Sequence, residues 1–108
     1  MELKDKKCVP CEGGVEPFNE KEIKEFKGKV DSEWYVVENK KIKRDFSFKN
    51  FKESMAFVNK IADIAEEEQH HPDIIIHYDE VEVELTTHAI KGLSENDFIL
   101  ASKIDNLS

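Results

Sequence analysis

The stretch DIIIHYDEVEVEL, residues 73–85, decides the fold class. Its second half alternates valine with glutamate, which is the pattern of a β-strand with one buried side. If Asp79-Glu80 forms a two-residue turn, the segment folds back on itself and its apolar side chains share one face. The facing pairs on this register are Tyr78 with Val81, Ile76 with Val83, and Ile74 with Leu85. The segment therefore predicts an antiparallel hairpin that covers a core with one face.

The residues before this hairpin predict a long helix over residues 50–69. Asn50 and Glu53 have the spacing of a capping box at its start. Pro72 stops the helix at the other end, because the residue before a proline disfavours helical geometry. Apolar residues recur at helical spacing with charges opposite, at Phe51, Met55, Val58, Ile61, Ala62 and Ala65.

Two shorter helices are expected on either side of these elements. The first begins near Asn19, places Ile23 and Phe26 on one face and ends at Gly28. The last begins at about Ser94. Its inward residues are expected to be Phe98, Ala101 and Ile104 or Ile99.

A first hairpin is expected from residues 34–38 and 41–48, which are rich in β-forming residues and turn at Asn39-Lys40. The resulting order is helix, two strands, helix, two strands, helix. This order predicts an α+β fold, in which a four-stranded antiparallel sheet of two hairpins carries three helices on one face. We expect a single domain over residues 1–108, with residues 1–18 as an irregular N-terminal arm.

Charge and hydropathy exclude two classes of partner. Charged residues make up 37% of the chain and the formal net charge is -8, so the phosphate backbone of a nucleic acid would be repelled. No apolar run approaches the ~18 residues of a membrane span, and MELKD at the start is no signal peptide, so we expect a cytoplasmic protein. The basic run of residues 40–44 is expected to form a solvated sheet edge.

Two adjacent histidines, His70 and His71, lie at the end of the long helix. One alternative is structural, because a histidine in the last turn can meet unpaired carbonyls and the negative end of the helix dipole. Glu66 favours a site, because it lies four residues before His70 and can orient its ring. His88 favours it too, because it ends the strand that pairs with the one after Pro72, provided that the chain bends at Thr87.

Three histidines can bind zinc or act as acid and base. Adjacent side chains diverge at a helix end, which is poor geometry for a closed set of zinc ligands. Acid–base chemistry needs similar groups in different protonation states, and neighbouring imidazoles disfavour one another's protonation. We therefore favour an acid–base site.

Two further motifs have structural alternatives. Cys8 and Cys11 form a single CxxC, and three interpretations stay open: reduced thiols without a catalytic role, half of a metal site, or a redox pair. Ser94 and Asp97 have the spacing of a capping box, which alone could explain the acid at that position.

The combination of these motifs resembles the pterin-4a-carbinolamine dehydratase family. The resemblance runs from Trp34 to Asp105 and rests on HHP at residues 70–72, TTH at residues 86–88 and GLSENDFILASKID at residues 92–105. The arm KKCVPCEGG also resembles the start of many microbial members. Gln69 stands where the family often has an acid, and two isoleucines stand where it commonly has an aromatic residue.

The resemblance implies a hydro-lyase that converts a 4a-hydroxytetrahydropterin, such as 4a-hydroxytetrahydrobiopterin, to the quinonoid dihydropterin and water. It implies that His70, His71 and His88 are catalytic and that Glu66 and Asp97 support them. It also implies that Gln69, Thr86 and Thr87 contact the substrate. No metal or other cofactor is expected, and the assembly is expected to be a homodimer or homotetramer.

The resemblance also implies a setting in pterin recycling, with an aromatic amino acid hydroxylase as a functional partner. Two other functions stay open. Some members of the family stabilise the dimer of a partner protein through a helix face, so the chain could be a protein-binding module. A zinc protein built from the CxxC motif and the histidines is the third alternative.

Overall fold

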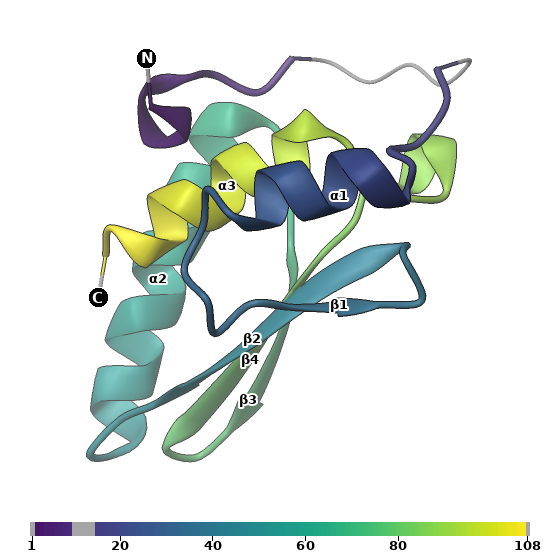
Figure 1. Ribbon diagram of the computed structural model, residues 1–108. Coiled ribbons are helices and arrows are strands. Elements are labelled where there is room, and N and C mark those ends of the chain that lie inside the picture. Colours follow the sequence, from purple (N-terminus) through teal and green to yellow (C-terminus); the bar gives the residue numbers. More distant parts are fainter. Residues whose placement is uncertain (1, 10–14, 108) are drawn as a thin grey trace.

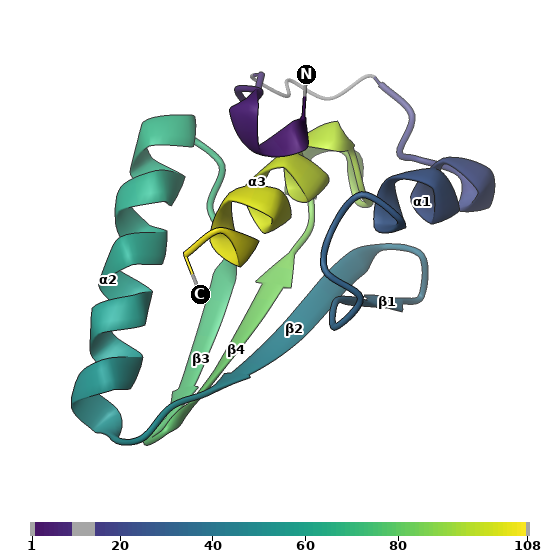
Figure 2. The same cartoon turned by 60° about the vertical axis from the view of Figure 1, so that its left-hand side comes forward.

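The computed structural model describes residues 2–9 and 15–107. Its four-stranded antiparallel sheet has the strand order β1-β2-β4-β3. The α-helices of the described residues lie together on one side of this sheet (Figures 1 and 2). The elements are η1 (Leu3–Asp5), α1 (Glu20–Lys27), β1 (Tyr35–Val37), β2 (Lys41–Ser47), α2 (Phe51–Glu68), β3 (Asp73–His77), β4 (Glu80–Leu85), η2 (His88–Ile90) and α3 (Glu95–Asp105). The predicted α+β class, with two hairpins and three helices, is confirmed.

The β3–β4 hairpin forms, but its predicted register is wrong by two residues. Ile76 pairs with Val81, and the turn is Tyr78-Asp79 rather than Asp79-Glu80. The Asp79 carbonyl accepts the Phe48 N–H at 2.7 Å, which ties the turn to the end of β2. Tyr78 is 64% exposed with φ 49° instead of packing inward. Because a two-residue slip preserves the faces, Val81, Val83 and Leu85 are still fully buried.

The β1–β2 hairpin turns through three residues rather than at Asn39-Lys40 alone. Glu38 and Asn39 both have positive φ, at 52° and 57°, and the Lys40 N–H donates to the Val37 carbonyl at 3.0 Å. Positive φ at both central residues is the geometry that matches the twist of paired strands.

The prediction that the basic run forms a sheet edge is wrong. Strand β2 lies inside the sheet, between β1 and β4. Lys41 Nζ lies 3.0 Å from Glu84 Oε1, and Lys43 Nζ lies 3.5 Å from carboxylate oxygens of both Glu82 and Glu84. Lys41 and Lys43 therefore pair with acidic residues of β4 on one face of the sheet, whereas Arg44 pairs with Asp105 of α3.

Helix α2 begins as predicted, since the Asn50 side chain accepts the Glu53 N–H at 2.9 Å. Its buried face is rotated from the predicted one, because Phe57 points into the core, where its ring centroid lies 4.6 Å from that of Phe46. The buried residues of α2 are Ser54, Phe57, Ile61, Ala65 and Glu68. Phe51 is 49% exposed, and Ala62 is exposed too.

The two other helices form where the sequence predicts them. Asn19 caps α1, and Gly28 follows its last residue. The ring centroids of Phe18 and Phe26 lie 4.9 Å apart. Helix α3 follows Ser94 and is buried at the expected Phe98 and Ala101, and at both of the alternatives, Ile99 and Ile104. No helix within residues 2–9 and 15–107 is both long and apolar enough to cross a membrane.

Candidate active site

The three predicted histidines line one cavity of about 250 Å³. His70 and His71 belong to the segment after α2, and His88 begins η2 after β4. The other lining residues are Val9, Gln69, Thr86, Thr87, Ala89 and Asn96. A larger hollow of about 400 Å³ beside Leu3 is lined by no histidine, so size alone does not mark the site.

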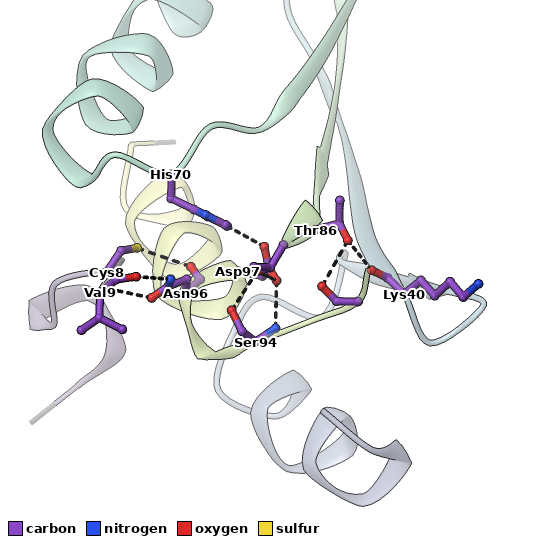
Figure 3. A network of polar contacts seen from close by, with 10 residues as sticks. Cys8, Val9, Lys40, His70, Thr86, Ser94, Asn96 and Asp97 are labelled. Atoms are coloured by element: carbon purple, nitrogen blue, oxygen red, sulfur yellow. Dashed lines mark hydrogen bonds and ion pairs between the residues drawn. The ribbon is translucent and has the colours of Figure 1, made fainter. Parts of the chain in front are cut away.

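His70 is held by Asp97, the acid in the first turn of α3. His70 Nε2 lies 2.7 Å from Asp97 Oδ1, and the Asp97 side chain has no exposed surface. Figure 3 shows the His70 ring reaching from the segment after α2 toward α3. An ionised carboxylate only accepts hydrogen bonds, so Nε2 carries a proton and the lone pair of a neutral His70 lies on Nδ1.

Asp97 also receives hydrogen bonds through its second carboxylate oxygen. Thr87 Oγ1 donates to Asp97 Oδ2 at 2.8 Å, and the Ser94 N–H donates to the same oxygen at 3.0 Å. Since Thr87 has one hydroxyl proton, the Ser94 hydroxyl donates to Thr87 Oγ1 at 2.8 Å. Asp97 therefore caps α3, as its spacing from Ser94 predicts, and contacts His70 at the same time.

The prediction that Glu66 orients His70 is wrong, because Glu66 contacts His71 instead. Glu66 Oε2 lies 2.5 Å from His71 Nε2, and both side chains are largely exposed, at 72% and 56%. The helix ends at Glu68, and the cap residue Gln69 takes a left-handed conformation with φ 54°. This change of direction turns His70 toward α3 (Figure 3). It also brings His71 back beside Glu66, in the last turn of α2.

The bend expected before His88 is present. Thr87 forms an isolated bridge with Gly92, and its N–H donates to the Gly92 carbonyl at 2.8 Å. The chain then enters η2, where His88 is exposed on the cavity. Gly92 is required here, because an added Cβ would lie 2.5 Å from Pro17 Cβ.

The predicted substrate-contact residues lie in the cavity wall, and each also has a partner within the protein. Thr86 Oγ1 donates to the Lys40 carbonyl at 2.6 Å, and Gln69 Nε2 donates to the Glu66 carbonyl at 2.6 Å. The Thr87 hydroxyl donates to Asp97, as described above. Their oxygens can still accept a hydrogen bond from a bound molecule.

The structure adds wall residues that the sequence interpretation did not name as site residues. Val9 comes from the arm, Ala89 from η2 and Asn96 from the first turn of α3. The signal that could have identified Val9 is its position inside the CxxC motif, but nothing local in the sequence places that motif against α3.

Cys8, next to Val9, is half-buried, and its Sγ lies 3.6 Å from the Asn96 carbonyl. Burial and the carboxylates of Glu68 and Asp97 raise the pKa of the Cys8 thiol to about 12. Cys11 lies outside the described residues. Within the described part of the chain, no group of three or more histidine, cysteine, aspartate or glutamate side chains is placed to hold a metal ion.

Comparison with known proteins identifies the family. The model of the family described as Pterin 4 alpha carbinolamine dehydratase matches residues 16–107. Similar proteins that carry the provisional name pterin-4-alpha-carbinolamine dehydratase include one from Nitrosomonas eutropha, 49% identical over 98% of this chain and 93% of its own length. Another is from Nitrosomonas europaea, 51% identical over the same shares of the two chains.

Solved structures agree with the fold. A crystal structure named transcriptional coactivator/pterin dehydratase, from Brucella melitensis, has a TM-score of 0.79 at 33% identity. The superposition covers 84% of this chain and 97% of that chain. A pterin dehydratase-like protein identified as a RuBisCO assembly factor in the alpha-carboxysome has a TM-score of 0.59 at 22% identity, covering 68% of this chain and 87% of that one, and shares the fold.

Proposed function

The chain belongs to the pterin 4 alpha carbinolamine dehydratase family, and on this premise we propose that it dehydrates a 4a-hydroxytetrahydropterin by histidine general acid–base catalysis. The observation that carries the proposal is the convergence of His70, His71 and His88 on one cavity. These residues come from two segments that the β3–β4 hairpin separates.

The reaction needs one proton donor and one proton acceptor. The acid protonates the 4a-hydroxyl, the C4a–O bond breaks, and the lone pair of the neighbouring nitrogen forms a C=N bond as water leaves. The base then removes the proton from that nitrogen, which gives the neutral quinonoid dihydropterin. Because one proton is supplied and one is removed, the enzyme returns to its starting protonation after proton exchange with solvent. General acid–base assistance of this kind contributes about 10²–10⁴-fold.

We assign the acid to His71 or His88 and the base to His70. The contact with buried Asp97 supports His70 as the base, because it directs the Nε2–H of His70 toward α3 and leaves Nδ1 to accept the proton. Glu66 supports His71 by accepting its Nε2–H. The remaining cavity residues that the family resemblance implicates, Gln69, Thr86 and Thr87, form walls that contact the pterin.

The wider setting is part of the same proposal. The chain forms a single domain over residues 1–108, acts in the cytoplasm and assembles as a homodimer or homotetramer. The pterin is recycled for a pterin-dependent enzyme such as an aromatic amino acid hydroxylase. The mechanism uses no metal or redox cofactor.

The test is a stopped-flow assay with a freshly generated 4a-hydroxytetrahydropterin, with and without a strong chelator. We expect catalysed formation of the quinonoid dihydropterin, unchanged by the chelator. Loss of activity on chelation, with one metal per chain by elemental analysis, would support the zinc protein instead. Absence of any acceleration over buffer would overturn the proposed activity.

A second candidate function is binding to a partner protein whose dimer it stabilises. Two observations favour it: the Brucella relative is named a transcriptional coactivator as well as a pterin dehydratase, and Phe51 is 49% exposed on α2. A pull-down from the native host separates the roles. If both exist, Phe51→Glu loses the partner and keeps dehydration, whereas His88→Ala does the reverse.

A further inference from the structure

We infer that Val9 of the arm forms one wall of the histidine cavity and that Asn96 is the positioning residue that holds this wall in place. The inference rests on the proposed function, because it assigns the wall to binding of the pterin. It concerns a part of the chain that precedes the residues matched by the family model, which begin at residue 16.

Asn96 binds both polar groups of the Val9 backbone. The Val9 N–H donates to Asn96 Oδ1 at 3.0 Å, and Asn96 Nδ2 donates to the Val9 carbonyl at 2.7 Å. Figure 3 shows this pair of hydrogen bonds beside the start of α3. Asn96 is only 6% exposed, and a buried amide needs such partners because an unpaired one is costly. The Asn96 side chain therefore depends on this segment of the arm for both of its hydrogen bonds to Val9, and it fixes the position of the segment.

A second buried polar residue holds the same segment. Glu68, 8% exposed at the end of α2, accepts the Cys8 N–H at 2.8 Å. Its other carboxylate oxygen lies 3.7 Å from Lys103 Nζ, which in turn donates to the Lys4 carbonyl at 2.8 Å. Two helices thus fix the backbone of the arm on one side of the cavity.

This docking leaves the Val9 side chain free to contact a ligand. Val9 lines the same cavity as His70, His71 and His88, and it is 66% exposed although it is apolar. Val9 carries no titratable group, so it can contribute to binding of a flat pterin ring but not to proton transfer. Release of the arm should therefore weaken substrate binding and leave the chemical step intact.

The kinetic test compares Asn96→Ala with Asn50→Ala. The first variant removes both hydrogen bonds to Val9, and the second removes a capping side chain at the far end of α2. We expect Asn96→Ala to raise KM by up to about 30-fold, with kcat within about twofold of wild type and an unchanged pH–rate profile, because each of the two lost hydrogen bonds contributes a net ~1 kcal/mol. Asn50→Ala should leave KM unchanged. An unchanged KM in Asn96→Ala, or a fall in kcat alone, would overturn the inference.

A further variant, Val9→Ala, keeps the backbone hydrogen bonds and shortens the wall. It should raise KM severalfold without affecting folding, because the Val9 side chain is exposed. It therefore keeps the inference testable if Asn96→Ala does not fold. A wild-type KM in Val9→Ala would contradict the assignment of Val9 to the wall.

Docking of the arm can be measured without any turnover, through alkylation of Cys8 by iodoacetamide in a Cys11→Ser background. Burial holds the pKa of Cys8 near 12 in the docked arm, and release should return it toward the ordinary value of 9.0. At pH 8 we expect Asn96→Ala to speed alkylation at least tenfold, and 7,8-dihydrobiopterin, a pterin without the 4a-hydroxyl, to slow it only when Asn96 is present.

The two readouts separate the inference from the proposed function. Suppose that the protein with Asn96 shows no dehydration, that the pterin still protects its Cys8, and that Asn96→Ala still speeds alkylation of Cys8. The proposed activity is then wrong, and the assignment of the arm to the cavity wall stands. Equal alkylation rates in both proteins, or no protection by the pterin, would overturn the inference while leaving dehydration by the wild-type protein standing.

Discussion

His70 Nε2 lies 2.7 Å from Asp97 Oδ1, and the Asp97 carboxylate is fully buried. This contact joins the segment after α2 to the first turn of α3, across 27 residues of chain. The same carboxylate accepts the Ser94 N–H and the Thr87 hydroxyl. One side chain therefore caps a helix, fixes the end of β4 and sets the orientation of a cavity histidine.

Asp97→Asn should lower both stability and kcat. Both carboxylate oxygens of Asp97 accept hydrogen bonds, but an asparagine keeps only one oxygen. Its NH₂ group would face either the Ser94 N–H and the Thr87 hydroxyl or the Nε2–H of His70, so in each arrangement one hydrogen-bond donor would face another. We expect a loss of about 1–3 kcal/mol in unfolding free energy and a fall in kcat of about 10- to 100-fold, the value of a hydrogen bond to a charged group. Urea unfolding and steady-state kinetics measure the two effects.

Asp63→Asn is the matched control, because Asp63 is exposed on α2. It should behave as wild type in both measurements. If Asp97→Asn were equally silent, the contact with His70 would have no part in catalysis.

Glu66→Gln should have a small effect. The Glu66–His71 pair is exposed, and exposed ion pairs are worth only ~0–1 kcal/mol. We expect kcat to fall by less than about fivefold and the unfolding free energy to be unchanged. The difference in kcat between Glu66→Gln and wild type should become smaller at high salt. Glu67→Gln is the control on the same helical turn. A loss of more than about 100-fold would mean that Glu66 itself exchanges a proton with the substrate.

Glu84→Gln should remove part of the acid sensitivity of the fold. Burial alone would raise the pKa of Glu84, but the hydrogen bond and charge of Lys41 and the charge of Lys43 outweigh it and lower the pKa below its ordinary value of 4.5. A carboxyl with a lowered pKa stabilises the fold above its unfolded pKa, and this stability is lost as pH falls through the folded pKa.

Wild type should therefore lose unfolding free energy below about pH 4.5 more steeply than Glu84→Gln, as followed by urea unfolding from pH 7 to pH 3. Glu80→Gln, at the exposed start of β4, should retain the wild-type slope. Identical slopes for wild type and Glu84→Gln would contradict the assigned direction of the pKa shift.

The sequence was sufficient to predict the α-helices, the strands, their order and the single covered face of the sheet, because each depends on local patterns such as the EVEVEL alternation and the Asn50 cap. It did not predict the short 3₁₀ helices η1 and η2. It was not sufficient to predict the register of the β3–β4 hairpin. A two-residue slip leaves the faces unchanged, and the choice depends on the hydrogen bond between Phe48 and Asp79, which no local pattern reveals.

The meeting of the three histidines at one cavity was predictable from the sequence, but the partners of His70 and Glu66 were not. Spacing of four residues suggested that Glu66 faces His70, which would require the helix to continue. The left-handed Gln69 ends it, so Glu66 meets His71 and His70 meets Asp97. The contact of Val9 with Asn96 spans 87 residues and depends on how the arm packs, which explains why neither residue was predicted.

The central claim is that three converging histidines perform the dehydration. The most direct measurement is the single-turnover rate of 4a-hydroxytetrahydropterin dehydration by His71→Ala, His88→Ala and His77→Ala. His77 lies on β3 and is exposed, and it does not line the cavity, so it serves as the matched control.

We predict that His71→Ala and His88→Ala slow the reaction by about 10²–10⁴-fold, with thermal unfolding unchanged because both side chains are exposed. His77→Ala should retain the wild-type rate. Wild-type rates in both cavity variants, or an equal loss in His77→Ala, would contradict the account.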